Sequence, residues 1–173
     1  MNASNLRTAG IATATLALAV GAGLATASPA SAHATAQLYG ATATQGGYGA
    51  MFIRIGHGCE GERTLVVKVN LPATFTSGKP QAIAGWKART RVHADGSRTL
   101  IWASTGNGLR DDQFMDFGVS VKWPSASGTY YIPTVQKCRT TSVAWNEIPQ
   151  QGQPEPEHPA PSVVVHKGTR AHH

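Results

Sequence analysis

The sequence predicts an all-β protein: a single Ig-like or cupredoxin-like β-sandwich of about eight or nine short strands, following a cleaved signal peptide. Three observations lead to this fold class. Short runs of β-branched and aromatic residues are separated by turn residues. No segment shows sustained helical periodicity. The chain also contains 19 Gly and 10 Pro residues, a composition rich in turn formers.

Residues 1–32 have the features of a secretory signal peptide. Arg7 supplies a positive charge, residues 11–24 form an apolar stretch, and Ala-x-Ala motifs follow. The stretch is short for a membrane span. We expect cleavage after Ala32, because Pro29 breaks the segment just before that site; cleavage after Ala27 is the alternative. Export predicts a secreted or extracytoplasmic location in the cell envelope.

The sandwich is expected over residues 33–166, where apolar runs end at turn residues. The clearest hairpin has Asp95-Gly96 at its turn. The composition of residues 150–161, rich in Pro, Gln and Glu, predicts an extended linker, and residues 167–173 are expected to be a disordered tail. The expected strands are residues 50–55, 64–71, 87–93, 98–103, 114–123, 129–136, 141–145 and 162–166.

Charge disfavours one class of partner. The chain holds 15 Lys and Arg residues against 9 Asp and Glu, a formal net charge of +6. The cations are scattered along the sequence, without a basic run or a recognition helix, so nucleic-acid binding is not expected. A basic surface weakly favours binding to anionic cell-wall polymers. The simpler interpretation of the positive charge is that it keeps the protein soluble. No second apolar run reaches membrane length, so no membrane span is expected in the mature chain.

Two cysteines, Cys59 and Cys138, lie in the mature chain. In an oxidising compartment this even count predicts a disulfide, and the long loop it would close implies a stabilisation of roughly 4 kcal/mol. Two buried thiols or a thiolate metal site are the alternatives.

His33 follows the preferred cleavage site directly, so cleavage after Ala32 makes it the first mature residue. A terminal histidine offers two nitrogen ligands, its α-amine and its imidazole. The α-amine has a pKa of about 8, which lets it release its proton to a metal at neutral pH. Cu(II) prefers nitrogen and oxygen ligands in a tetragonal plane, whereas zinc needs a closed tetrahedral set with more His or Cys and ranks second.

These features together resemble the YcnI-like copper-binding proteins, a family of exported bacterial β-sandwich domains. The resemblance covers roughly residues 33–165 and rests on the order and spacing of several motifs. They are Ala32-His33, the segment 52–61 (Phe-Ile-Arg-Ile-Gly-His-Gly-Cys-Glu-Gly), Gly85-Trp86, 117–121 (Phe-Gly-Val-Ser-Val), 131–138 (Tyr-Ile-Pro-Thr-Val-Gln-Lys-Cys), Val143-Ala144-Trp145 and 158–161 (His-Pro-Ala-Pro).

The resemblance implies a Cu(II) site built on one histidine. His33 would supply its amine and Nδ1, Glu60 a carboxylate, and Trp145 an indole beside the metal. The resemblance also implies that residues 158–161 lead into a closing strand. The chain departs from the family at Arg139, where many members have an acidic residue, and it stops without the C-terminal membrane helix of many members, which favours release.

Each of these residues also has an ordinary interpretation. Glu60 fits an exposed turn, with Glu62 as its neighbouring competitor, and a buried tryptophan such as Trp145 is usually a core residue. Among the other histidines, His57 is a surface residue or a supporting ligand. His93 is expected to be exposed. The tail histidines His172 and His173 bind metals adventitiously.

The first functional hypothesis is therefore a non-catalytic Cu(II)-binding protein for extracytoplasmic copper binding, trafficking or storage. Its candidate partners are copper-transport membrane proteins or another extracytoplasmic copper carrier. The second hypothesis is a structural or adhesive cell-envelope domain, which needs neither His33 nor Glu60. A histidine-brace copper mono-oxygenase ranks third, because it needs a second histidine and only His57 and His93 are available before the tail. No Gly-x-Ser-x-Gly hydrolase motif is present.

Overall fold

The computed structural model describes residues 33–168. The predicted signal peptide and residues 169–173 of the predicted tail lie outside the described residues. All regular structure in the described range is β-strand. The strands are β1 (Thr35–Gln37), β2 (Tyr48–Ile55), β3 (Val66–Leu71), β4 (Ser77–Pro80), β5 (Trp86–Val92), β6 (Arg98–Ser104), β7 (Met115–Lys122), β8 (Gly128–Tyr131), β9 (Thr134–Lys137), β10 (Ser142–Trp145) and β11 (Ser162–Val165).

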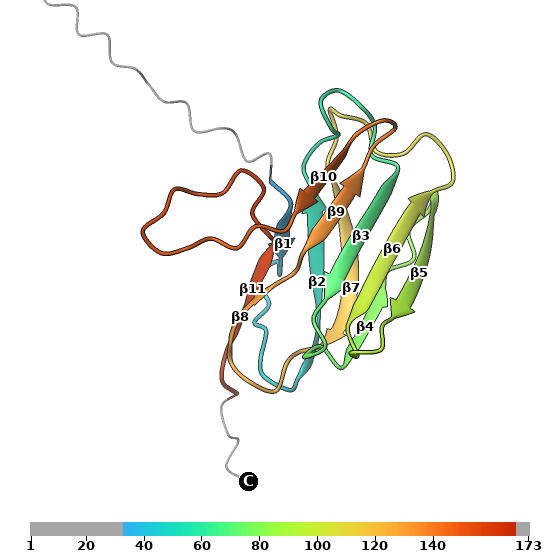
Figure 1. Ribbon diagram of the computed structural model, residues 1–173. Helices are drawn as coiled ribbons and strands as arrows, with labels where there is room; N and C mark the ends of the chain where they lie inside the picture. Colours follow the sequence, from blue (N-terminus) through green and yellow to red (C-terminus); the bar gives the residue numbers. More distant parts are fainter. Residues whose placement is uncertain (1–32, 169–173) are drawn as a thin grey trace, which may run out of the picture. The chain divides into compact units, whose positions relative to one another are not determined.

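The strands form a two-layer sandwich, which confirms the predicted fold class (Figure 1). One layer is a four-stranded sheet in the order β1-β2-β7-β4. The other is a five-stranded sheet in the order β10-β9-β3-β6-β5. All pairings between these strands are antiparallel. A short ribbon of β8 and β11 completes the fold. Just after β11, His166 forms a parallel bridge with Thr44 in the connection between β1 and β2.

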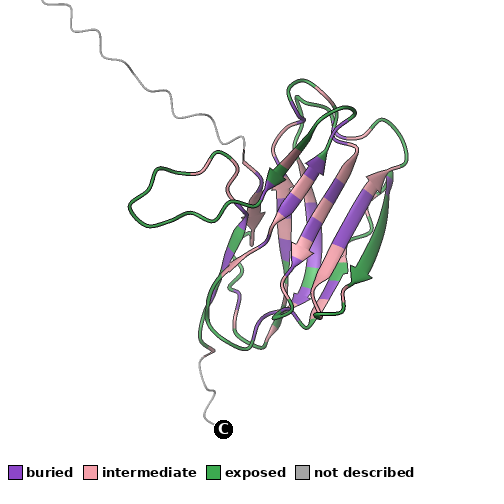
Figure 2. Cartoon of the chain, viewed as in Figure 1, coloured by how far each residue is buried: buried purple, intermediate pink, exposed green. Residues whose placement is uncertain are grey.

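The core lies between the two sheets because apolar residues alternate along the central strands. Along β3 every second residue is buried, ending at Leu71, and β2 buries Met51, Ile53 and Ile55 in the same way (Figure 2). Phe117 on β7 packs edge-on against Trp102, with ring centroids 5.4 Å apart. These alternating patterns fix which face of each strand is internal.

The structure differs from the predicted strands in three places. β1 and β4 were not predicted, because three or four residues such as Thr-Ala-Gln and Ser-Gly-Lys-Pro show no apolar alternation. The predicted strand at residues 129–136 is two strands, β8 and β9. Pro133 lies between them and lacks the N–H that a continuous ladder needs.

Residues 146–161 form a loop that projects from the sandwich between β10 and β11 (Figure 1). Its base is closed by backbone hydrogen bonds: the N–H groups of Asn146 and Glu147 donate to the His158 carbonyl, and that of Ala160 donates to the Glu147 carbonyl. The prediction of an extended linker is therefore wrong. β11 then pairs with β8, in the position of the closing strand that the family resemblance implies.

Candidate metal centre

His33 lies just before β1, where its side chain meets two residues from the far end of the chain. Its imidazole ring packs against the indole of Trp145, with centroids 5.9 Å apart and planes tilted by 58°. Its Nδ1 atom lies 3.6 Å from Oε1 of Glu155 in the β10–β11 loop. The His33 side chain is 24% exposed, so it is partly enclosed and still reachable from solvent.

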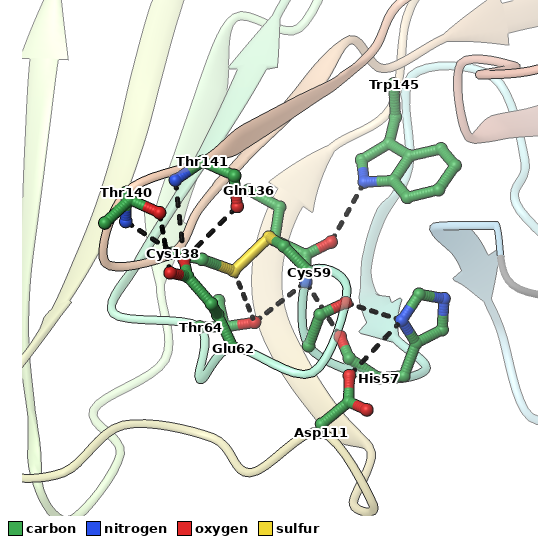
Figure 3. Close-up of a disulfide and its surroundings, with 11 residues drawn as sticks. His57, Cys59, Glu62, Thr64, Asp111, Gln136, Cys138, Thr140, Thr141 and Trp145 are labelled. Carbon is green, nitrogen blue, oxygen red and sulfur yellow. Dashed lines mark hydrogen bonds and ion pairs between the residues drawn. A yellow bond between two sulfur atoms is a disulfide. The ribbon is translucent and has the colours of Figure 1, made fainter.

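Trp145 is the last residue of β10 and is buried. Its indole N–H donates to Oε1 of Gln136 at 3.2 Å (Figure 3). His158 packs edge-on against the same indole, with ring centroids 5.2 Å apart. Trp145 thus contacts both His33 and His158, and it forms an apolar wall of the candidate site.

Gln136 connects this wall to the loop that carries Glu60. Its amide nitrogen donates to the His57 carbonyl at 2.7 Å and to the Thr64 hydroxyl at 2.8 Å, while its amide oxygen accepts from Trp145 (Figure 3). The residue is only 1% exposed. A buried amide with every polar atom engaged holds its partners in one arrangement. The sequence analysis missed Gln136, although a polar residue in phase with buried positions of a strand is a usable signal.

His158 was also missed as a site residue. Its Nδ1 atom is buried and has no hydrogen-bond partner within the described part of the chain. An unsatisfied buried polar atom is costly and calls for an explanation. Here it lies on the residue that packs against Trp145, so this nitrogen belongs to the immediate surroundings of the candidate site.

A hollow of about 470 Å³ adjoins His33. Its walls come from β1, from the end of β8, from the start of β11 and from the β10–β11 loop. The side chains of His33, Tyr131 and Glu155 line it together with three prolines of that loop region, Pro149, Pro159 and Pro161. The hollow gives the His33 imidazole an approach route from solvent.

Glu60 lies at a tight turn between the disulfide cysteine Cys59 and Glu62. The turn is closed by reciprocal backbone hydrogen bonds between Cys59 and Glu62, and its two central residues, Glu60 and Gly61, have φ of 51° and 86°. Within the described residues, no hydrogen bond or ion pair joins Glu60 to His33. A glutamate at positive φ is uncommon, because such turns favour Asn or Gly.

Glu62 has a structural role. Its carboxylate accepts hydrogen bonds from the backbone and hydroxyl groups of Thr140 and Thr141. These bonds lower the pKa of Glu62 from 4.5 to about 2, and the bond from the Thr140 hydroxyl has the largest effect. Because its oxygens are already engaged, Glu62 is a poor competitor of Glu60 as a metal ligand.

The disulfide between Cys59 and Cys138 is present, which confirms that prediction; the Cα atoms are 6.0 Å apart and 79 residues separate them in sequence. It joins the Glu60 turn to the end of β9 (Figure 3). His57 contacts the Gly58 carbonyl and lies 3.9 Å from Asp111. The Nε2 atom of His93 pairs with the Thr99 hydroxyl in the β5–β6 hairpin.

The structure thus brings together two of the three predicted site residues, His33 and Trp145, and adds Glu155 and His158 around them. Within residues 33–168 no three His, Cys, Asp or Glu side chains are already grouped as a metal site. The nearby donors are an imidazole, a carboxylate and an unpartnered ring nitrogen. These nitrogen and oxygen atoms fit the ligand preference of Cu(II).

Comparison with known proteins places the chain in a family. Residues 33–165 match the family described as "Domain of unknown function (DUF1775)", and the chain belongs to that family, which includes the YcnI-like proteins. No curated protein matches. Within residues 33–168 no helix is long and apolar enough to cross a membrane.

Two solved structures are similar. An uncharacterized protein from Nocardia farcinica, reported to have an immunoglobulin-like fold, is 33% identical; the alignment covers 77% of this chain and 97% of that chain, with a TM-score of 0.67. A cohesin module from a Clostridium perfringens family 33 glycoside hydrolase is 9% identical, with 79% and 97% covered and a TM-score of 0.52. The second likeness is one of fold alone.

Proposed function

We propose that the mature chain is a non-catalytic Cu(II)-binding protein that holds or transfers copper outside the cytoplasmic membrane. Its ligands are the α-amine and Nδ1 of His33 and a carboxylate. The indole of Trp145 lies beside the metal and shields one side of the site. The observation that carries the proposal is the position of His33: its Nδ1 lies near a carboxylate and its ring lies on a buried tryptophan. That the family match begins at residue 33 further supports a mature terminus there.

The amine exists only after cleavage. In the uncut chain the His33 nitrogen is part of a peptide bond with Ala32. Cleavage converts it into a basic amine on the same residue as Nδ1, and the two nitrogens can then chelate one ion. Cu(II) would then be held by a bidentate chelate from one residue, while Trp145 excludes water from one side of the imidazole.

Two carboxylates compete for the remaining position. The family resemblance implies Glu60, whereas the structure has Glu155 within 3.6 Å of Nδ1. We favour Glu155 because it already faces the anchoring nitrogen. Glu60 is the alternative ligand, although within the described residues no ion pair joins it to His33.

Calorimetric titration with Cu(II) tests this assignment. The protein must start at His33 and carry His172→Ala and His173→Ala, which remove adventitious tail ligands. Glu155→Gln is expected to weaken binding at least tenfold, about the effect seen for groups that orient or supply metal ligands. Glu157→Gln, an exposed change in the same loop, is the matched control and should leave the affinity unchanged. Loss of affinity in Glu60→Gln alone would restore Glu60 as the ligand.

The alternative is a structural or adhesive domain of the cell envelope. The observation that favours it is the lack of a ready-made three-residue metal group within residues 33–168. A ligand that binds only the folded protein must raise its thermal stability. An unchanged unfolding temperature with excess Cu(II) would therefore favour the structural domain.

A further inference from the structure

The outer face of the five-stranded sheet carries a cluster of cations that the sequence does not reveal as a group. On β6, Leu100 and Trp102 are fully buried in the core, so the alternate residue Ile101 lies on the outer face. Cross-strand partners share a face, and Arg89 on β5 and Lys68 on β3 are both registered opposite Ile101. Arg89 and Lys68 therefore point outward from the same row.

The neighbouring rows add three more cations. Lys87 on β5 and Lys137 on β9 lie in one row, linked through Ala103 and Val66. Arg91 lies two residues beyond Arg89 on β5, on the same face. We define the cationic face as the five outward cations of this sheet: Lys68, Lys87, Arg89, Arg91 and Lys137.

No carboxylate lies on any strand of this sheet. The nearest in sequence, Asp95, is in the β5–β6 turn and is bonded to the Ser97 backbone and hydroxyl groups. None of the five cations forms an ion pair within residues 33–168. Four of them are exposed, and Lys68 is partly so.

This face accounts for the excess positive charge of the domain. Residues 33–168 contain 13 Lys and Arg residues and 9 Asp and Glu residues. Outside the cationic face the two signs are nearly balanced. The fold thus gathers five of the scattered basic residues onto one surface, because β3, β5 and β9 belong to one sheet.

We propose that the cationic face binds an extended polyanion of the phosphodiester type outside the membrane. Along β5 the three cations are spaced about 6.8 Å apart, a repeating line of positive charge. Arg89 and Arg91 can bind phosphate oxygens in a bidentate manner, and the lysines act as point charges. Without partner carboxylates, all five charges are available to a ligand.

The shape of the sheet favours a flexible polymer over a planar membrane. Neighbouring strands are rotated by roughly 20–25°, so β5 and β9, three steps apart, differ in direction by about 60–75°. A flat bilayer would meet only part of such a twisted face, whereas a flexible chain can follow it. Charged side chains on edge strand β5 also hinder edge-to-edge pairing, and the experiment separates that role from binding.

The probe is a soluble poly(glycerol phosphate) chain, titrated into the protein starting at His33 at salt concentrations from 50 to 200 mM. If all five cations contact phosphate, the slope of log affinity against log salt is about −3.5, which is about a 100-fold loss over this range. The triple variant Lys87→Gln, Arg89→Gln and Arg91→Gln should have a slope of about −1.4, or about a sevenfold loss. Lys79→Gln, Lys122→Gln and Lys167→Gln remove the same charge elsewhere and should keep the full slope.

Equal slopes in the two triple variants would overturn the proposal, because binding would then depend on net charge alone. So would no measurable binding at 50 mM salt. Stronger binding to vesicles containing phosphatidylglycerol would also overturn it, because a planar lipid surface would then be the preferred ligand. Self-association of the β5 variant without any loss of polymer binding would assign the cations to edge protection instead. Circular dichroism confirms that both triple variants are folded.

Discussion

Gln136 connects the candidate site to the rest of the sandwich. It satisfies the Trp145 indole N–H, the His57 carbonyl and the Thr64 hydroxyl at once. Gln136→Leu would remove the partner of the buried Trp145 indole N–H and one hydrogen bond of the buried Thr64 hydroxyl, and each buried unsatisfied group costs about 1–3 kcal/mol. We expect a loss of about 2–4 kcal/mol in the free energy of unfolding, measured by urea denaturation. Gln113→Leu, an exposed change, should have little effect.

The hydrogen bonds of the Glu62 carboxylate should make the stability of the fold depend on pH in the acid range. Its pKa is lowered to about 2, so its hydrogen bonds to Thr140 and Thr141 stabilise the fold fully above pH 4.5. This contribution is lost as the pH falls from 4.5 toward 2, where the carboxylate becomes protonated in the folded state. Unfolding midpoints measured across this range should fall less steeply for Glu62→Gln than for the unmodified protein. Parallel curves for the two would contradict the assignment.

At the scale of single residues, the sequence predicted part of the candidate site. His33 and Trp145 were identified from the cleavage motif and the family resemblance, and the structure places them in contact. Glu155 and His158 were missed because they lie in a segment whose composition predicts a linker. Their proximity to His33 and Trp145 follows from the closed base of the loop, which depends on pairing between residues 147 and 160.

At the scale of elements, the disulfide fixes the Glu60 turn against the end of β9. It closes a long loop, so the double variant Cys59→Ser and Cys138→Ser should lose about 4 kcal/mol of stability. Chemical denaturation of the oxidised and variant proteins measures this difference. A loss well below 1 kcal/mol would mean that the unfolded chain is already constrained in another way.

The strands with alternating apolar residues were predictable, since that alternation itself produces the buried faces of β2, β3 and β7. The short edge strands β1 and β4 were not, because they exist through backbone pairing with β2 and β7 rather than through side-chain pattern. Of these two strands, β1 lies next to the candidate site: its pairing with β2 fixes the backbone that begins two residues after His33.

At the scale of the whole molecule, the sandwich assembles the candidate site from both ends of the domain. His33 comes from its start, and Trp145, Glu155 and His158 come from its last quarter. Copper binding should therefore raise the free energy of unfolding of the whole domain. At a free Cu(II) concentration 100 times the dissociation constant, the expected gain is about 2.7 kcal/mol. Differential scanning calorimetry with and without Cu(II) measures it.

The proposed cupric site requires a free terminus at His33, and electron paramagnetic resonance of bound Cu(II) tests this requirement directly. Two proteins are compared, one beginning at His33 and one with a single extra alanine before it, both carrying His172→Ala and His173→Ala. We predict that the first gives a tetragonal spectrum with nitrogen hyperfine structure and that the second loses it, along with most of its affinity. The same spectrum and affinity in both proteins would contradict the account.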